Sequence, residues 1–139
     1  ANAIGCGPSI LYPDRPECAA FLRTLGPVHA FDEWDQFITA SVFGGFSGAT
    51  FSFMGQIIDW FTTHGVSHDV ARALVAETLR GNAEAILQSD QSLDEIVSGI
   101  ATKGGITELA NMVLESHQNR KAWQEALGKI EKRVKTSRH

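Results

Sequence analysis

SGATFSFMGQIIDWFTTH, residues 47–64, decides the fold of this 139-residue chain. Its large apolar residues lie at spacings that place them on nearly every side of one helix: Phe51, Phe53, Met54, Ile57, Ile58, Trp60 and Phe61. A helix that is apolar almost all round must be buried on most sides. The remaining helices are short, so we expect a second copy of the chain to cover this one in a homodimer, whose interface resembles a core cut in half. The alternative is a compact monomer around one central helix.

The segment before this stretch is also expected to be helical. Asp32 can cap a helix that carries its apolar residues at helical spacing up to Val42. Phe43-Gly44-Gly45-Phe46 is expected to end that helix, so that a new one opens at Ser47.

Every segment after this stretch is predicted to be helical too. Gly65 ends the apolar helix, and Ser67 caps the next one. Ser92 and Glu95 form a capping-box pattern before a short helix. The next helix is expected to start at Thr107 and to turn three apolar residues inward: Leu109, Met112 and Val113. A last helix runs from about Asn119.

Residues 1–31 have a different pattern. A short apolar run at residues 9–12 predicts a strand, residues 16–25 predict a helix with proline at its first position, and residues 28–31 predict a second strand. Strand, helix and strand with such short links make an α/β unit, yet a complete parallel sheet needs more chain. We therefore expect a mainly α protein: a helical dimerisation domain at 32–139, preceded by the end of a larger α/β domain at 1–31.

Composition narrows the possible partners. The net charge of −4 argues against a nucleic-acid partner, because phosphates require a basic surface. The two cysteines, Cys6 and Cys18, are too few for a zinc site and indicate a reducing, cytoplasmic location. No uninterrupted apolar run approaches the ~20 residues that span a bilayer, so no membrane partner is expected.

A candidate anion site lies at Ala101-Thr102-Lys103-Gly104-Gly105-Ile106-Thr107. Paired glycines let backbone N–H groups converge, and a helix N-terminus adds unpaired donors and the positive end of its dipole. Thr102 and Thr107 add hydroxyl groups, and Lys103 adds a positive charge. Together these groups predict a carboxylate site. The local pattern alone favours a plain connection between two helices.

The same segment resembles the Thr-Ser-Pro-Gly-Gly-x-Thr motif of the pyrroline-5-carboxylate reductase family, and Val113-Leu114-Glu115 is similar to the Leu-Glu that ends the family's next helix. Gly65-Val66 with Ala71 is similar to the family's linker into its long helix. The resemblance extends over essentially the whole chain, and residues 1–31 are similar to the end of the family's Rossmann-like domain.

This resemblance implies a function. Enzymes of the family transfer hydride from NADPH or NADH to the C=N bond of Δ1-pyrroline-5-carboxylate to form proline, and their helical domains interlock as dimers. Carried over by position, Thr102, Gly104, Gly105 and Thr107 would hold the carboxylate of the substrate. The resemblance does not assign the catalytic residues, and no metal site is expected.

The cofactor half is absent from this sequence. No GxGxxG turn follows a strand, and Gly5-Cys6-Gly7-Pro8 precedes its strand instead. We therefore expect NADPH or NADH to bind the full-length parent and no cofactor to bind this chain alone.

Two departures from the family keep other functions open. Phe43–Ala49 replaces a turn that carries hydroxyl groups and a tyrosine, and Lys103 replaces the usual proline. One alternative is a non-catalytic helical module for homodimerisation. The other is a reductase of a different cyclic imine or keto acid, in which Lys103 binds a second acidic group.

Overall fold

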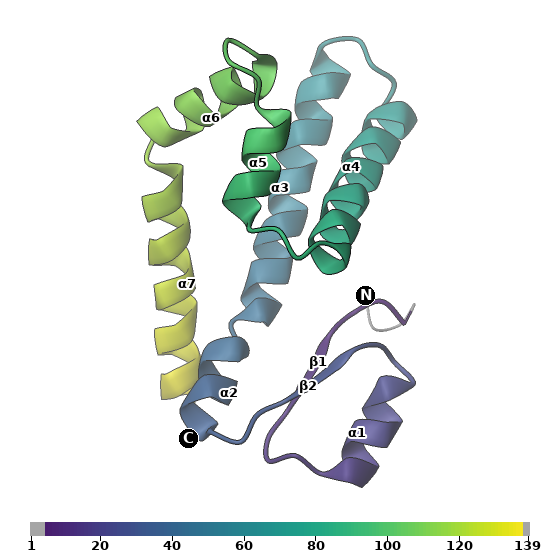
Figure 1. The fold of residues 1–139 in the computed structure, drawn as a ribbon, viewed down its shortest axis with the longest axis vertical. Coiled ribbons are helices and arrows are strands. Elements are labelled where there is room, and N and C mark those ends of the chain that lie inside the picture. Colours follow the sequence, from purple (N-terminus) through teal and green to yellow (C-terminus); the bar gives the residue numbers. More distant parts are fainter. Residues whose placement is uncertain (1–4, 138–139) are drawn as a thin grey trace. The chain divides into compact units, whose positions relative to one another are not determined.

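A computed structural model of the chain describes residues 5–137, and within that range it is mainly helical, as predicted. Figure 1 shows the order of its elements: β1 Ser9–Leu11, α1 Pro16–Arg23, β2 Val28–Ala30, α2 Trp34–Ala40, α3 Phe43–Thr63, α4 His68–Gln88, α5 Leu93–Ile100, α6 Ile106–Ser116 and α7 Asn119–Thr136. The described residues form two compact units. The first unit comprises residues 5–47 and 124–137, and the second comprises residues 48–123.

The first unit begins with the predicted strand–helix–strand arrangement. β1 and β2 pair in parallel, with Ser9 opposite Val28 and Leu11 opposite Ala30. The turn after α1 requires Gly26, whose φ is +141° and where a Cβ atom would collide with the Gly7 carbonyl oxygen. Gly26, just before β2, therefore lets the chain pass close to the backbone that precedes β1.

The junction between α2 and α3 differs from two predictions. Asp32 does not cap α2, because the N-cap residue is Glu33 and its side chain makes no capping bond. The predicted break at residues 43–46 is also wrong, since α3 already begins at Phe43 and both glycines lie inside it. The break falls earlier, where the Ser41 hydroxyl donates to the Ile38 carbonyl oxygen (2.6 Å) and competes with the helical hydrogen bonds.

The residues from Trp34 to Thr63 include one helical stretch that is long and apolar enough to cross a membrane, judged by length and composition alone. The stretch contains two acidic residues, Asp35 and Asp59, so it is not one uninterrupted apolar run. Only two residues separate α2 from α3, which gives the combined stretch its length. An apolar helix buried between two subunits has the same composition.

The second unit starts with an antiparallel hairpin of α3 and α4 (Figure 1). Gly65 ends α3 as predicted: its φ is +93°, its N–H donates to the Thr62 carbonyl oxygen, and the Val66 N–H donates to that of Phe61. These two bonds form the Schellman arrangement that closes helix C-termini. Ser67 occupies the N-cap of α4 as predicted, although its side chain makes no capping bond.

The start of α5 carries the predicted capping box. The Glu95 carboxylate accepts from the Ser92 N–H at 2.7 Å, and the Ser92 hydroxyl oxygen accepts from the Glu95 N–H at 3.3 Å. Hydrogen bonds from Ser92 hold the pKa of the Glu95 carboxyl below its ordinary value. Local sequence is therefore enough to fix this helix start.

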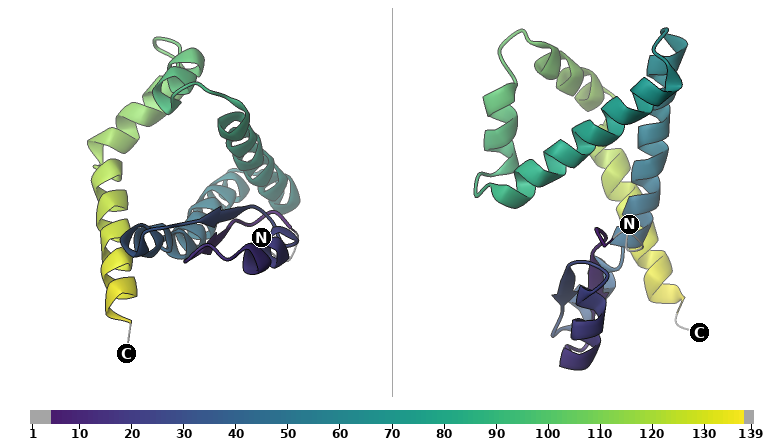
Figure 2. Two further views of the ribbon diagram at one scale, coloured as in Figure 1. Left: turned by 60° about the horizontal axis from the view of Figure 1, so that its bottom comes forward. Right: turned by 90° about the vertical axis from the view of Figure 1, so that its right-hand side faces the viewer.

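The apolar faces of α5 and α6 are exposed in the single chain. Figure 2 shows the helices of the second unit following one another around an open turn. Leu109, Met112 and Val113 were predicted to face inward, but each is more than half exposed. That prediction was wrong for one chain, because no other helix of the second unit packs closely along α6.

Candidate functional site

The loop between α5 and α6 is a tight turn at residues 102–105. The Gly105 N–H donates to the Thr102 carbonyl oxygen at 2.8 Å, and Gly104 has a φ of +75°. A positive φ at the third position of such a turn favours glycine, and proline is favoured at the second position. Lys103 occupies that second position and retains the turn, so its replacement of proline leaves the loop intact.

Gly105 brings the side chain of Thr102 against the start of α6. A Cβ atom at Gly105 would lie 2.5 Å from the Thr102 Oγ1 atom and 2.8 Å from its carbonyl oxygen. Any larger residue would push the threonine away. The structure thus places the hydroxyl group of Thr102 beside the glycine pair, as a carboxylate site would require.

Thr107 does not occupy the N-cap position that the sequence predicts. The N-cap of α6 is Gly105, and Thr107 is the second residue of the helix. The glycine lacks a capping side chain, which is why the hydroxyl residue was mistaken for the cap. The N–H groups in the first turn of any helix have no intrahelical partners. Those of Ile106 and Thr107 therefore lie at the positive end of the α6 dipole, next to the loop.

A fifth residue of this loop was missed from the sequence. The Gly104 N–H donates to the Glu108 Oε2 atom at 2.6 Å, so a carboxylate already lies at the start of α6. The signal was present, because glutamate is common at the third position of a helix, where it can accept from backbone donors before the helix. A site for a carboxylate ligand predicts donors, whereas Glu108 is an acceptor.

Two hollows lie in the second unit. One of about 700 Å³ adjoins the loop and is lined by residues that include Ala101, Glu108, Glu115 and Arg120. The other, of about 400 Å³, lies between α3 and α4 and is largely apolar, with Phe53, Ile57, Phe61 and Leu74 among its lining residues. Charged side chains contribute to the lining of the first, whereas the second has the apolar lining of a protein interface.

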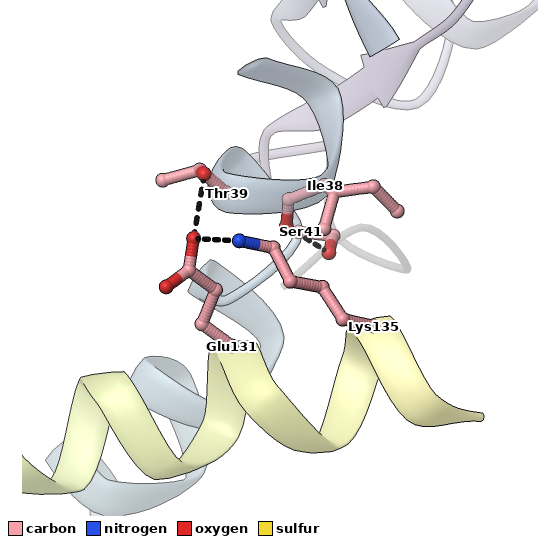
Figure 3. A network of polar contacts seen from close by, with 5 residues as sticks. All are labelled: Ile38, Thr39, Ser41, Glu131 and Lys135. Carbon is pink, nitrogen blue, oxygen red and sulfur yellow. Dashed lines mark hydrogen bonds and ion pairs between the residues drawn. The ribbon is translucent and has the colours of Figure 1, made fainter. Parts of the chain in front are cut away.

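A polar network in the first unit joins α2 to α7 (Figure 3). The Thr39 hydroxyl donates to Glu131 Oε1 at 2.8 Å, and the Lys135 ammonium group lies 3.1 Å from the same oxygen. The Thr39 hydrogen bond, followed by Lys135, holds the pKa of the Glu131 carboxyl below its ordinary value. Thr39 therefore has a structural partner within the first unit.

Comparison with known proteins identifies the family. A model described as pyrroline-5-carboxylate reductase dimerisation matches residues 35–137. The chain belongs to this family. It is 32% identical, over 99 residues, to the Delta-1-pyrroline-5-carboxylate reductase apf3 of Gibberella fujikuroi, a match that covers 70% of this chain and 34% of that protein.

Solved structures of the same family share the fold. The pyrroline carboxylate reductase of Plasmodium falciparum with NADP bound has a TM-score of 0.85 at 22% identity and covers 96% of this chain and 56% of its own. The pyrroline-5-carboxylate reductase of Coxiella burnetii has a TM-score of 0.77 at 26% identity, with coverage of 86% and 44%. The enzyme from Streptococcus pyogenes has a TM-score of 0.80 at 19% identity, with coverage of 86% and 46%.

The chain therefore spans about a third of the curated relative that it matches and about half of these solved structures.

The strand–helix link of the first unit does not fit a dinucleotide. Residues 12–15, between β1 and α1, are Tyr, Pro, Asp and Arg, which cannot present the glycine-rich backbone that a pyrophosphate requires.

Proposed function

We propose that the intact protein is an NAD(P)H-dependent Δ1-pyrroline-5-carboxylate reductase, cytoplasmic and active in proline biosynthesis. In this proposal residues 1–31 end a Rossmann-like cofactor domain, and residues 32–139 supply homodimerisation and bind the substrate carboxylate. The cofactor would supply hydride to the C=N carbon. The residues of this chain hold and orient the substrate through its carboxylate.

One observation carries the substrate-binding role. A carboxylate, that of Glu108, accepts from the Gly104 N–H at 2.6 Å within the family's glycine loop. The loop is thus shaped to donate to a carboxylate oxygen. Thr102 adds a hydroxyl group beside Gly105, and Thr107 adds another in the first turn of α6.

The exposed apolar surface supports homodimerisation. None of the residues of α3 is buried in the single chain, although this helix carries the most apolar segment of the sequence. The groove between α3 and α4 is open, and the family is described by its dimerisation. A second copy covering α3 would remove this surface from water.

A second candidate is a homodimerisation module without catalytic activity. The residues that replace the family's hydroxyl-bearing turn, from Phe43 onward, form the start of α3, and a Cβ atom at Gly45 would meet Ile130 at 2.8 Å. This segment therefore serves packing. A reductase of a different cyclic imine or keto acid, with Lys103 binding a second acidic group, is a third candidate because Lys103 is exposed on the turn.

Binding of L-proline to the isotope-labelled chain tests the proposal. We expect NMR shifts of the amides of residues 102–107, with Thr102→Ala weakening binding by about tenfold through loss of one hydrogen bond to a charged group. Thr24→Ala, the same change at an exposed threonine outside the loop, is the matched control and should leave binding unchanged. If the loop amides move neither in the wild type nor in a variant that lacks the Glu108 carboxylate, even at high proline concentration, the carboxylate role is wrong and the dimerisation module leads.

A further inference from the structure

We propose that Glu108 is a self-blocking residue: its carboxylate occupies the Gly104 donor in the free protein and must leave before a substrate carboxylate binds there. This inference rests on the proposed carboxylate site and adds a form of regulation to it. The Glu108 side chain would set the affinity of the loop for its ligand without touching the reacting atoms.

The contact has the geometry of a charge-assisted hydrogen bond. At 2.6 Å it is at the short end for an N–H donor and a carboxylate oxygen. Gly104 donates from a turn that the Gly105–Thr102 hydrogen bond holds in place. A second carboxylate could not share this donor, because two like charges at hydrogen-bonding distance repel each other. Substrate and Glu108 therefore compete for one N–H group.

Comparison with α5 shows why this carboxylate can be displaced. Glu95 also stands third in its helix, but it accepts from both the N–H and the hydroxyl of Ser92, at 2.7 and 2.8 Å, and that hydroxyl also accepts from the Glu95 N–H. The N-cap of α6 is Gly105, which has no side chain to hold Glu108 in this way. Glu108 is thus fixed by the loop amide alone among the contacts described, whereas Glu95 is enclosed in a reciprocal box.

The displaced side chain has a place to go. Glu108 is half-buried, and it lines the 700 Å³ hollow on α6 together with Arg120. A rotation away from Gly104 would move its carboxylate into this hollow, toward water. The energy lost at Gly104 is then partly regained, which makes the exchange reversible.

The measurement is the affinity of the 139-residue chain for L-proline, followed by the Gly104 amide signal. The fraction of loops that Glu108 leaves open limits the apparent affinity. Glu108→Ala should therefore bind proline roughly three- to tenfold more tightly than the wild type, the effect of losing one competing hydrogen bond. Glu108→Gln, which keeps an acceptor but loses the charge, should give a smaller increase. The Gly104 amide should move upfield in the ligand-free Glu108→Ala variant.

Two controls separate blocking from other effects. Glu95→Ala removes the equivalent carboxylate from α5, and Glu115→Ala removes a negative charge from the same hollow on α6. Both should leave the affinity for proline unchanged. An increase with Glu115→Ala as large as that with Glu108→Ala would show a general charge effect and overturn the blocking role.

The possible failures can be told apart. Equal binding by the wild type and both Glu108 variants overturns the self-blocking inference and leaves the carboxylate site standing. Absence of binding by the wild type and by Glu108→Ala overturns both. Binding by Glu108→Ala alone supports both, because it shows a competent site that the native glutamate keeps closed.

Discussion

The two compact units differ in where their large apolar side chains lie. In the first unit, Tyr12 contacts the rings of Trp34 and Phe37, with centroids 5.1 and 5.9 Å apart, so an aromatic group that directly follows β1 is covered by those of α2. Of the eighteen exposed large apolar residues among those described, fifteen belong to the second unit. The comparison shows that the strand–helix–strand unit covers aromatic side chains within itself. The helices of the second unit require another protein surface to cover their apolar side chains.

The physical reason is how closely the elements of each unit pack against one another. Parallel strands joined through α1 are brought together by hydrogen bonds, and α2 then returns against β1. In the second unit the α5 and α6 helices have 8 and 11 residues and few contacts with α3. Such short helices gain most of their stability from packing, so a partner must supply it.

The largest expected effect is loss of the dimer on placing a charge in the second unit. Phe53 lines the groove between α3 and α4, so Phe53→Asp would bury an unpaired carboxylate under the partner. We expect the dimer dissociation constant to rise by about a hundredfold or more. Sedimentation across a concentration series measures it.

Phe21→Asp is the matched control, because Phe21 is an exposed phenylalanine of α1 in the first unit. This variant should dimerise like the wild type. A wild-type chain that sediments as a folded monomer at micromolar concentration would refute the proposed interface. Equal weakening by the two variants would remove the contrast between the units.

A smaller effect is expected where α3 packs against α7 within the first unit. A Cβ atom at Gly45 would lie 2.8 Å from the Ile130 Cδ1 atom, whereas one at Gly44 would meet nothing within 4 Å. Gly45→Leu should therefore lower the free energy of unfolding by about 1–3 kcal/mol through overpacking. Gly44→Leu should raise it by about 0.5–1 kcal/mol, because leucine favours helix more than glycine does.

Urea unfolding of both variants measures these changes. Opposite signs would confirm that the contact with Ile130 decides the cost at Gly45. The same sign at both positions would mean that α7 does not pack on this part of α3, and that the first unit is as open as the second.

The smallest effect concerns the start of α5. Ser92 lowers the pKa of Glu95 in the folded chain below its ordinary value of 4.5, so the charged carboxylate contributes stability above that pH. The contribution is lost as the pH falls through the folded pKa. Glu95→Gln should therefore melt slightly below the wild type at pH 7, and the difference should vanish in acid.

Thermal melting from pH 7 to pH 3 measures this difference, with Glu125→Gln as a control. Glu125 is a helical glutamate whose pKa is lowered by Lys129 and not by a cap. Salt should reduce its effect and leave that of Glu95 largely intact, because screening acts mainly on exposed ion pairs. A difference at Glu95 that persists at pH 3 would show that the capping charge is not its cause.

Local patterns predicted most elements. The strands beside Pro8 and Pro27, the capping box at Ser92 and the helix end at Gly65 were all found from a few neighbouring residues. The glycine loop was also found, because glycine pairs before a helix are a local signal. The roles of its residues in binding remain a prediction.

The sequence by itself determined the helices, their order and the apolar character of α3, since these depend on spacing along the chain. Only the tertiary structure decided that Ile130 of α7 fills the space beside Gly45 near the start of α3. It also decided that Gly105 caps α6 and that Glu108 takes the Gly104 donor. The reason is that a hydrogen bond or a packing contact depends on where atoms meet in space, and spacing along the chain does not fix that for a turn between two helices.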